Sequence, residues 1–203
     1  MFITEQESNY DRVCRDLLVE VERTGARANA SFLGGSVEGD SARVPLFGED
    51  CFVRSDGVFK EGRRLDTFGS ILAVRYLLQA GTAEIRNSWL PYRDLKNGAQ
   101  FASYIKAHIE EKLALAFSGR PAVLKARLEA LGGLAHTGEM RADLVFVVRP
   151  FPRVPVLCIF WDKDEEFAAS FQFLFDASAP SYLDMESLAA TLQYIYLRLA
   201  GEA

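Results

Sequence analysis

The sequence predicts an α+β fold in which a mainly antiparallel sheet of about five or six strands packs against helices. Segments with helical periodicity occupy the middle and both ends of the chain, and segments with strand patterning occupy residues 42–60 and 142–175. Of the 203 residues, 49% are hydrophobic and 25% are charged, which is typical of a globular protein. This length fits a single domain over residues 1–203.

The first predicted helix spans about residues 5–23. It begins at a capping box, Thr4–Glu7, whose end residues can each accept a hydrogen bond from the other's backbone N–H group. Gly25 supplies the stop. Because apolar residues recur every three or four positions between these signals, we expect one face of this helix to lie on a core.

Short strand-like runs follow at 42–47, 51–54 and 57–60. Ser55-Asp56-Gly57 predicts a tight hairpin turn between the last two, because glycine readily adopts the positive φ that such turns require. This part of the chain therefore supplies several strands of the predicted sheet.

Two arginines precede the second predicted helix. Asp66 is placed to cap this helix, and Gly81 ends it. Arg63 and Arg64 lie just before the cap, and arginines beside a helix N-terminus can bind an anion together with the free N–H groups. We keep an anion site as a hypothesis, with two solvated arginines as the simpler interpretation.

The strongest helical pattern covers residues 99–117 and carries a broad apolar face. His108 belongs to that face. A histidine in such a place is usually a hydrogen-bonded core residue, but partial desolvation at the rim of a core also produces a general base. Pro121 then opens another helix, which Gly132-Gly133 ends.

The C-terminal third changes to strand patterning. Residues 142–148 and 156–161 are nearly continuous apolar runs, typical of strands that are covered on both faces. Aromatic residues then alternate with smaller or polar residues over 167–175, which predicts a strand with one aromatic face. A last helix over about 184–200 begins near Asp184.

The densest charge feature joins two of these strands. Asp162, Asp164, Glu165 and Glu166 lie within five residues, with Lys163 as the one basic residue among them. Their mutual repulsion can be relieved by a divalent cation or by a basic partner surface. Because neither the calcium-loop spacing nor a supporting histidine is present, we expect no metal here and favour either partner docking or an exposed solubilising turn.

Catalytic signatures are sparse. The chain has two histidines, and the motifs HExxH and GxSxG do not occur. His136 lies close in sequence to Glu139 and Asp143, a set that can form a metal or acid–base site, although such spacing in a loop is weak evidence and a solvated loop is the simpler interpretation. An enzyme built from His108, His136, Asp143 and the carboxylates of residues 164–166 is therefore the alternative to a binding protein.

Composition excludes several classes of partner. The net charge of −5 has the wrong sign for a protein that neutralises phosphates, so we expect no nucleic acid. The longest apolar stretch is far shorter than the roughly 20 residues of a membrane helix, so we expect no membrane span. Cys14, Cys51 and Cys158 lie far apart in apolar segments, which favours reduced core cysteines. With no export signal at the N-terminus, we expect a cytoplasmic protein. We also expect no cofactor.

A resemblance adds to these observations. The string from Phe151 to Phe167, which reads FPRVPVLCIFWDKDEEF, and the later Tyr182-Leu183 are similar to the prokaryotic family catalogued as domain of unknown function 3786. Tyr76–Leu78, Trp89 and Leu131–Gly133 fit the same family, so the resemblance covers most of the chain. It departs from the family at Asp184–Ser187, where an acidic pair is expected directly after Tyr182-Leu183.

The resemblance implies a cytoplasmic protein of anaerobic bacteria or archaea. Some members carry an additional cysteine-rich iron–sulfur segment, which this chain lacks, or are encoded near corrinoid and one-carbon enzymes. Together with the acidic segment, this suggests a non-catalytic accessory or binding protein linked to anaerobic metabolism, with a partner that presents a basic surface. The sequence does not specify an oligomeric state.

Overall fold

A computed structural model describes residues 9–138 and 140–201 and confirms the α+β class with antiparallel sheets. The chain divides into two compact units, one made of Met1–Pro45 with Glu49–Ala80 and the other of Leu46–Gly48 with Gly81–Ala203. The prediction of one domain over residues 1–203 stays a prediction. Within the described ranges, none of the helices combines the length and the apolar composition needed to span a lipid bilayer.

The first unit is a five-stranded antiparallel sheet with two helices packed on it. Alternate residues of the central strands are buried, and α1 and α2 contact each other and the sheet. The strand order follows the chain order, and the elements are α1 (Asn9–Thr24), η1 (Ala26–Ser31), β1 (Ser36–Glu38), β2 (Ser41–Leu46), β3 (Glu49–Arg54), β4 (Gly57–Lys60), β5 (Arg63–Arg64) and α2 (Thr67–Gln79).

The local signals of this unit are largely confirmed. The tight turn after Arg54 joins β3 to β4, with Arg54 paired to Gly57. Asp66 caps α2, because its Oδ1 accepts a hydrogen bond from the Gly69 N–H group at 2.8 Å. α1 buries Leu17, Leu18 and Val21, and the capping box at Thr4–Glu7 lies outside the described residues.

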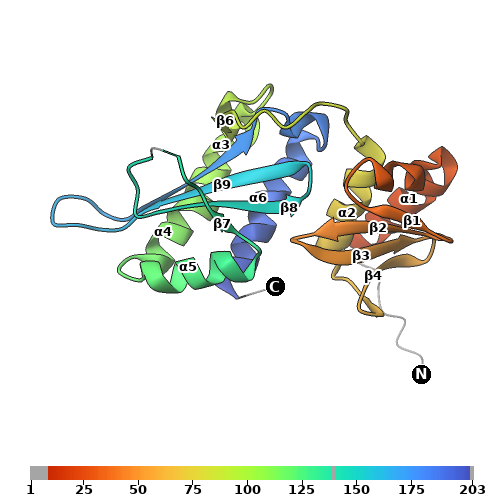
Figure 1. Ribbon diagram of the computed structural model, residues 1–203, viewed down its shortest axis with the longest axis horizontal. Helices are drawn as coiled ribbons and strands as arrows, with labels where there is room; N and C mark the ends of the chain where they lie inside the picture. Colours follow the sequence, from red (N-terminus) through yellow and green to blue (C-terminus); the bar gives the residue numbers. More distant parts are fainter. Residues whose placement is uncertain (1–8, 139, 202–203) are drawn as a thin grey trace. The chain divides into compact units, whose positions relative to one another are not determined.

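The second unit contains a five-stranded antiparallel sheet in the order β6-β10-β9-β8-β7. β9 lies at the centre and is buried along nearly all of its length, as its continuous apolar sequence predicts. Helices α4, α5 and α6 lie together on one side of the sheet (Figure 1). The strands are β6 (Trp89–Pro91), β7 (Leu134–Ala135), β8 (Leu144–Phe151), β9 (Val154–Trp161) and β10 (Ser170–Asp176).

A π-helical turn interrupts the helix predicted over residues 99–117. α3 (Ala99–Ile105) leads into the π-helical turn η3 (Lys106–Glu110), and α4 (Glu111–Phe117) continues from it. A π turn inserts an extra residue into the helical repeat, so it changes which side chain faces the sheet. The remaining elements are η2 (Tyr92–Asp94), α5 (Pro121–Ala130), η4 (Ala179–Ser181) and α6 (Met185–Ala200).

Two details differ from the expected strands. The strands of residues 42–60 and 142–175 belong to two separate sheets. The last strand begins at Ser170 and not at Phe167, whose side chain is 70% exposed. The alternation of apolar residues continues through Phe167, but a turn held by Asp164 takes that part of the chain out of the sheet.

The cysteines are free, as expected, but they differ in burial. Cys51 and Cys158 are buried, and desolvation raises the pKa of the Cys51 thiol to about 11. The expectation that all three are core residues is wrong for Cys14, which is half-buried and lines a surface cavity of the first unit.

The aromatic face of β10 predicts a large stability effect. Phe171, Phe173 and Phe175 are all buried on one face, and β10 packs against α4 and η3. Phe173→Ala should lower the free energy of unfolding by about 3–5 kcal/mol, because it removes a ring from a close-packed site. Urea denaturation measures this change, and a loss below about 1 kcal/mol would contradict the packing described here.

Candidate functional site

The segment between β9 and β10, residues 162–169, projects from one end of the sheet (Figure 1). We call it the acidic–aromatic loop. Asp164 shapes it, because its Oδ1 accepts hydrogen bonds from the N–H groups of Glu166 at 2.8 Å and Phe167 at 2.7 Å. These two hydrogen bonds lower the pKa of the Asp164 carboxyl, so the group stays ionised. The turn therefore keeps its negative charge.

Two further carboxylates anchor the base of the acidic–aromatic loop. Asp162 Oδ1 accepts hydrogen bonds from the N–H groups of Gly119 at 2.6 Å and Lys163 at 2.8 Å. Asp143, directly before β8, accepts the Asp162 N–H at 2.7 Å through Oδ2. The loop is thus tied to the end of α4 and to the start of β8, which fixes its direction.

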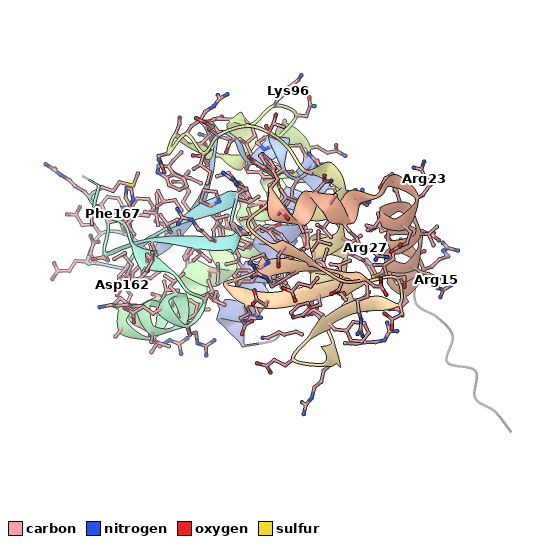
Figure 2. The ribbon with its side chains drawn as sticks, turned by 45° about the vertical axis from the view of Figure 1, so that its right-hand side comes forward. Arg15, Arg23, Arg27, Lys96, Asp162 and Phe167 are labelled. Atoms are coloured by element: carbon pink, nitrogen blue, oxygen red, sulfur yellow. The ribbon has the colours of Figure 1, made fainter. Side chains whose placement is uncertain are left out.

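Aromatic and acidic side chains share one cavity at this end of the second unit. The cavity has a volume of about 540 Å³ and is lined by Asp143, Trp161, Asp162, Asp164, Phe167, Ala168 and Ser170. Trp161 is held in place, because its Nε1 donates to the carbonyl oxygen of Arg141 at 2.7 Å. Figure 2 shows Asp162 and Phe167 at the same end of this unit.

This combination can bind a cationic group. The faces of aromatic rings attract an ammonium or guanidinium group, and nearby carboxylates attract the same cationic group by their negative charge. Glu165 lies exposed in the same loop, next to Asp164. The structure therefore brings together Asp143, Asp162 and Asp164, three of the residues singled out in the sequence, around two aromatic rings that the charge pattern alone did not single out.

The expectation that His108 is a core residue is wrong. Its ring is exposed and stacks on Tyr104 with centroids 4.6 Å apart, and its Nδ1 lies 3.2 Å from the Tyr104 carbonyl oxygen. The buried stripe of this helix runs through Ile105 and Ile109. His108 directly precedes the buried Ile109 and so lies roughly a quarter of a turn around the helix from it, on the exposed flank.

His136 lies elsewhere. It is half-buried just after β7, with its ring 6.3 Å from that of Trp89 in an edge-to-face contact. No hydrogen bond or ring contact among the described residues joins His108 or His136 to Asp143. In residues 9–138 and 140–201, no three His, Cys, Asp or Glu side chains are grouped so as to hold a metal ion, and Glu139 lies outside the described residues.

The arginine pair belongs to the first unit. Arg63 is exposed, and Arg64 donates from Nη2 to the carbonyl oxygen of Asp56 at 2.6 Å. Arg64 lines a cavity of about 490 Å³ that also contains the carboxylates of Asp11 and Asp56. These carboxylates and the Asp66 cap of α2 oppose an anion, and the anion site stays a prediction.

Sequence reasoning missed the most deeply buried carboxylate of the helical face. Glu110, in η3, is 8% exposed and lines a cavity of about 460 Å³ beside Lys106 and Phe173. Its Oε1 accepts the Phe173 N–H at 2.8 Å, and its Oε2 lies 3.5 Å from Lys106 Nζ. Burial raises the pKa of the Glu110 carboxyl. The one sequence feature that points to the burial of Glu110 is its position next to Ile109, on the apolar face of the helix.

Glu110 occupies the place of a missing strand partner. β6 pairs with residues 174–176 of β10 and ends at Pro91, after which the chain turns into η2. Pro91 ends the pairing before it reaches Phe173, whose N–H would otherwise be unpaired in a buried place. The Glu110 carboxylate accepts this N–H, so its first role is structural.

The raised pKa of Glu110 predicts how stability depends on pH. The folded protein holds this proton more tightly than the unfolded chain, in which the carboxyl titrates near its ordinary 4.5. Protonation of Glu110 therefore stabilises the folded protein. This stabilisation is complete below about pH 4.5, the pKa of the unfolded chain, and is lost as the pH rises through the raised pKa of the folded protein. Glu110→Gln keeps an acceptor for Phe173 and does not titrate, so the variant should become more stable relative to the wild type between about pH 4 and about pH 8.

Urea denaturation of both proteins across this pH range measures the difference. Glu129→Gln, which alters an exposed carboxylate on α5, is the control and should show a much smaller pH dependence. A wild-type protein that gains stability relative to Glu110→Gln as pH rises would contradict the argument.

Comparisons with known proteins identify the family. The family model described as domain of unknown function (DUF3786) matches residues 26–198. Searches of curated proteins and of solved structures found no significant match. Because the family match covers most of the chain and confirms the resemblance seen in the sequence, the chain belongs to the DUF3786 family.

Proposed function

We propose that this protein is a non-catalytic accessory protein that binds a protein partner with a basic surface through the acidic–aromatic loop. The observation that carries this proposal is the exposure of Phe167, which is 70% accessible beside Trp161 and three aspartates in one cavity. Large exposed aromatic residues with a polar rim are the usual energetic centres of protein interfaces. This end of the second unit has that composition.

The local structure favours binding in two ways. The acidic–aromatic loop is already ordered by the hydrogen bonds of Asp162 and Asp164, so little conformational entropy is lost when a partner binds. Its four carboxylates outnumber its single ammonium group, which attracts a basic partner and repels an acidic one. A lysine or arginine of the partner can then lie against the rings of Trp161 and Phe167.

The cellular setting is part of the same proposal. The sequence motifs resemble those of proteins from anaerobic bacteria and archaea, some encoded near corrinoid and one-carbon enzymes. We therefore propose a cytoplasmic partner that takes part in such metabolism. Purification of the protein from its native host, followed by mass spectrometry, identifies this partner.

The test compares two exposed apolar side chains of the same unit. Phe167→Ala should weaken binding of the purified partner at least about tenfold, since it removes the exposed ring. Leu134→Ala is the matched control, because Leu134 is 67% exposed and lies on β7. Glu165→Gln should reduce the salt dependence of binding without unfolding the loop. Asp164 is left intact because its carboxylate holds the turn.

Binding is measured by surface plasmon resonance at about 50 mM and about 300 mM salt, with melting temperatures as a check on folding. Equal affinities for Phe167→Ala and Leu134→Ala would overturn the proposed role of the acidic–aromatic loop.

A further inference from the structure

The edge of β10 next to the acidic–aromatic loop has a stretch without a strand partner. β6 pairs with residues 174–176 only, while β9 pairs with residues 170–175 on the other side. The Phe173 N–H points toward the β6 side, because Glu110 accepts it there, and the Ala177 N–H donates to Ser88 on that side. Backbone groups alternate along a strand, so the N–H and C=O of Phe171 also point away from β9.

These two backbone groups are buried without a strand partner. Phe171 is 1% exposed, and its outward N–H and C=O lie beyond residues 174–176, the part of β10 that β6 pairs with. Nearly all buried backbone groups in proteins are paired, because an unpaired one loses its hydrogen bonds to water without replacement. The strand edge at Phe171 is therefore a place where an added acceptor and donor would stabilise the protein.

A hollow lies beside this edge. It has a volume of about 300 Å³, and its apolar lining includes Phe171, Ala114 and Leu115, of which Leu115 is 81% exposed. Ala168 and Ser170 line both this hollow and the cavity of the acidic–aromatic loop. The strand edge, the apolar hollow and the acidic cavity thus adjoin one another at the start of β10.

We infer that the edge of β10 at Phe171 binds an extended, basic peptide segment of the partner as an added strand. This inference rests on the proposed function and specifies its partner. The peptide backbone pairs with the N–H and C=O of Phe171, as in other cases of strand addition to a sheet edge. Its apolar side chains contact Leu115, and its basic residues reach the acidic–aromatic loop. Glu110 ends the pairing, because it already binds Phe173.

Charge favours such a peptide over a second copy of this chain. The carboxylates of Asp143, Asp162 and Asp164 surround one end of the surface, and Lys163 is the one basic residue in the loop. A second copy carries the same acidic loop and a net charge of −5, so it would bring like charges together. The side chain of Lys106 is 56% exposed and can move aside as the strand enters.

The test uses a synthetic fluorescent peptide in which valine and threonine alternate over about six residues, followed by lysines. Two further versions carry N-methyl groups at every valine or at every threonine, which block opposite hydrogen-bonding edges of the peptide. We expect the parent peptide to bind in a salt-sensitive manner, and one methylated version to lose at least about tenfold in affinity while the other keeps most of it. The Phe171 amide proton should shift downfield in NMR spectra on binding.

Variants of the full chain separate the two proposals. Leu115→Lys should weaken binding of the parent peptide, whereas Leu134→Lys should not, because Leu134 is exposed on β7 away from the hollow. Equal binding of all three peptides would overturn strand addition and leave docking by charge intact. Loss of binding on methylation, with no effect of Glu165→Gln or Phe167→Ala, would overturn the proposed role of the acidic–aromatic loop and keep the added strand.

Two further outcomes would also overturn the inference. One is no binding of the parent peptide at about 1 mM, a concentration at which even weak strand addition is detectable. The other is dimerisation of the chain that shifts the Phe171 amide without peptide, which would make a second copy the occupant of this edge.

Discussion

The hydrogen bond from the Phe173 N–H to Glu110 is the contact on which the second unit depends. Without it, the end of β6 at Pro91 would leave a buried donor in β10 unpaired. The same contact fixes the π-helical turn against the sheet, because Glu110 is the last residue of η3. It also divides the outer edge of β10 into three parts. Residues 174–176 pair with β6, Phe173 binds the Glu110 carboxylate, and Phe171 has no strand partner.

Carboxylates replace missing backbone partners at several places in this unit. Asp164 accepts two N–H groups of the acidic–aromatic loop, and Asp162 accepts the N–H of Gly119. The buried Asp176 does the same for Arg86 and Ser178. These bonds fix the position of each charge. The proposed binding surface thus follows from these hydrogen bonds, since the ordered loop presents Phe167 and its acidic neighbours together.

The sequence predicts the repetitive parts of this fold well. The helix over residues 99–117, apart from its π turn, the coverage of β9 on both faces and the burial of Phe171, Phe173 and Phe175 on one face are confirmed. The expectation that the run in β8 is covered on both faces is wrong for its first part, because Leu144, Val145 and Val147 are only half-buried. Division of the strands between two sheets was not predictable, since it depends on long-range pairing and not on local pattern. Among the candidate residues, the acidic segment was identified by charge alone.

The errors have local physical causes. The sequence pattern of the helix gives no sign of the π turn, so neither the buried position of Glu110 nor the exposed flank position of His108 could be inferred from it. Phe167 continues the alternation of the strand, and only the hydrogen bonds to Asp164 take it out of the sheet.

Amide hydrogen exchange at Phe173 tests the central claim most directly, with the wild type compared with Glu110→Ala. The account predicts that the Phe173 amide is protected in the wild type and loses at least about tenfold of that protection in the variant, because its acceptor is removed. The Phe175 amide should stay protected in both, since β6 pairs with it at Leu90. Equal protection of Phe173 in the two proteins would contradict the claim that Glu110 takes the place of a strand.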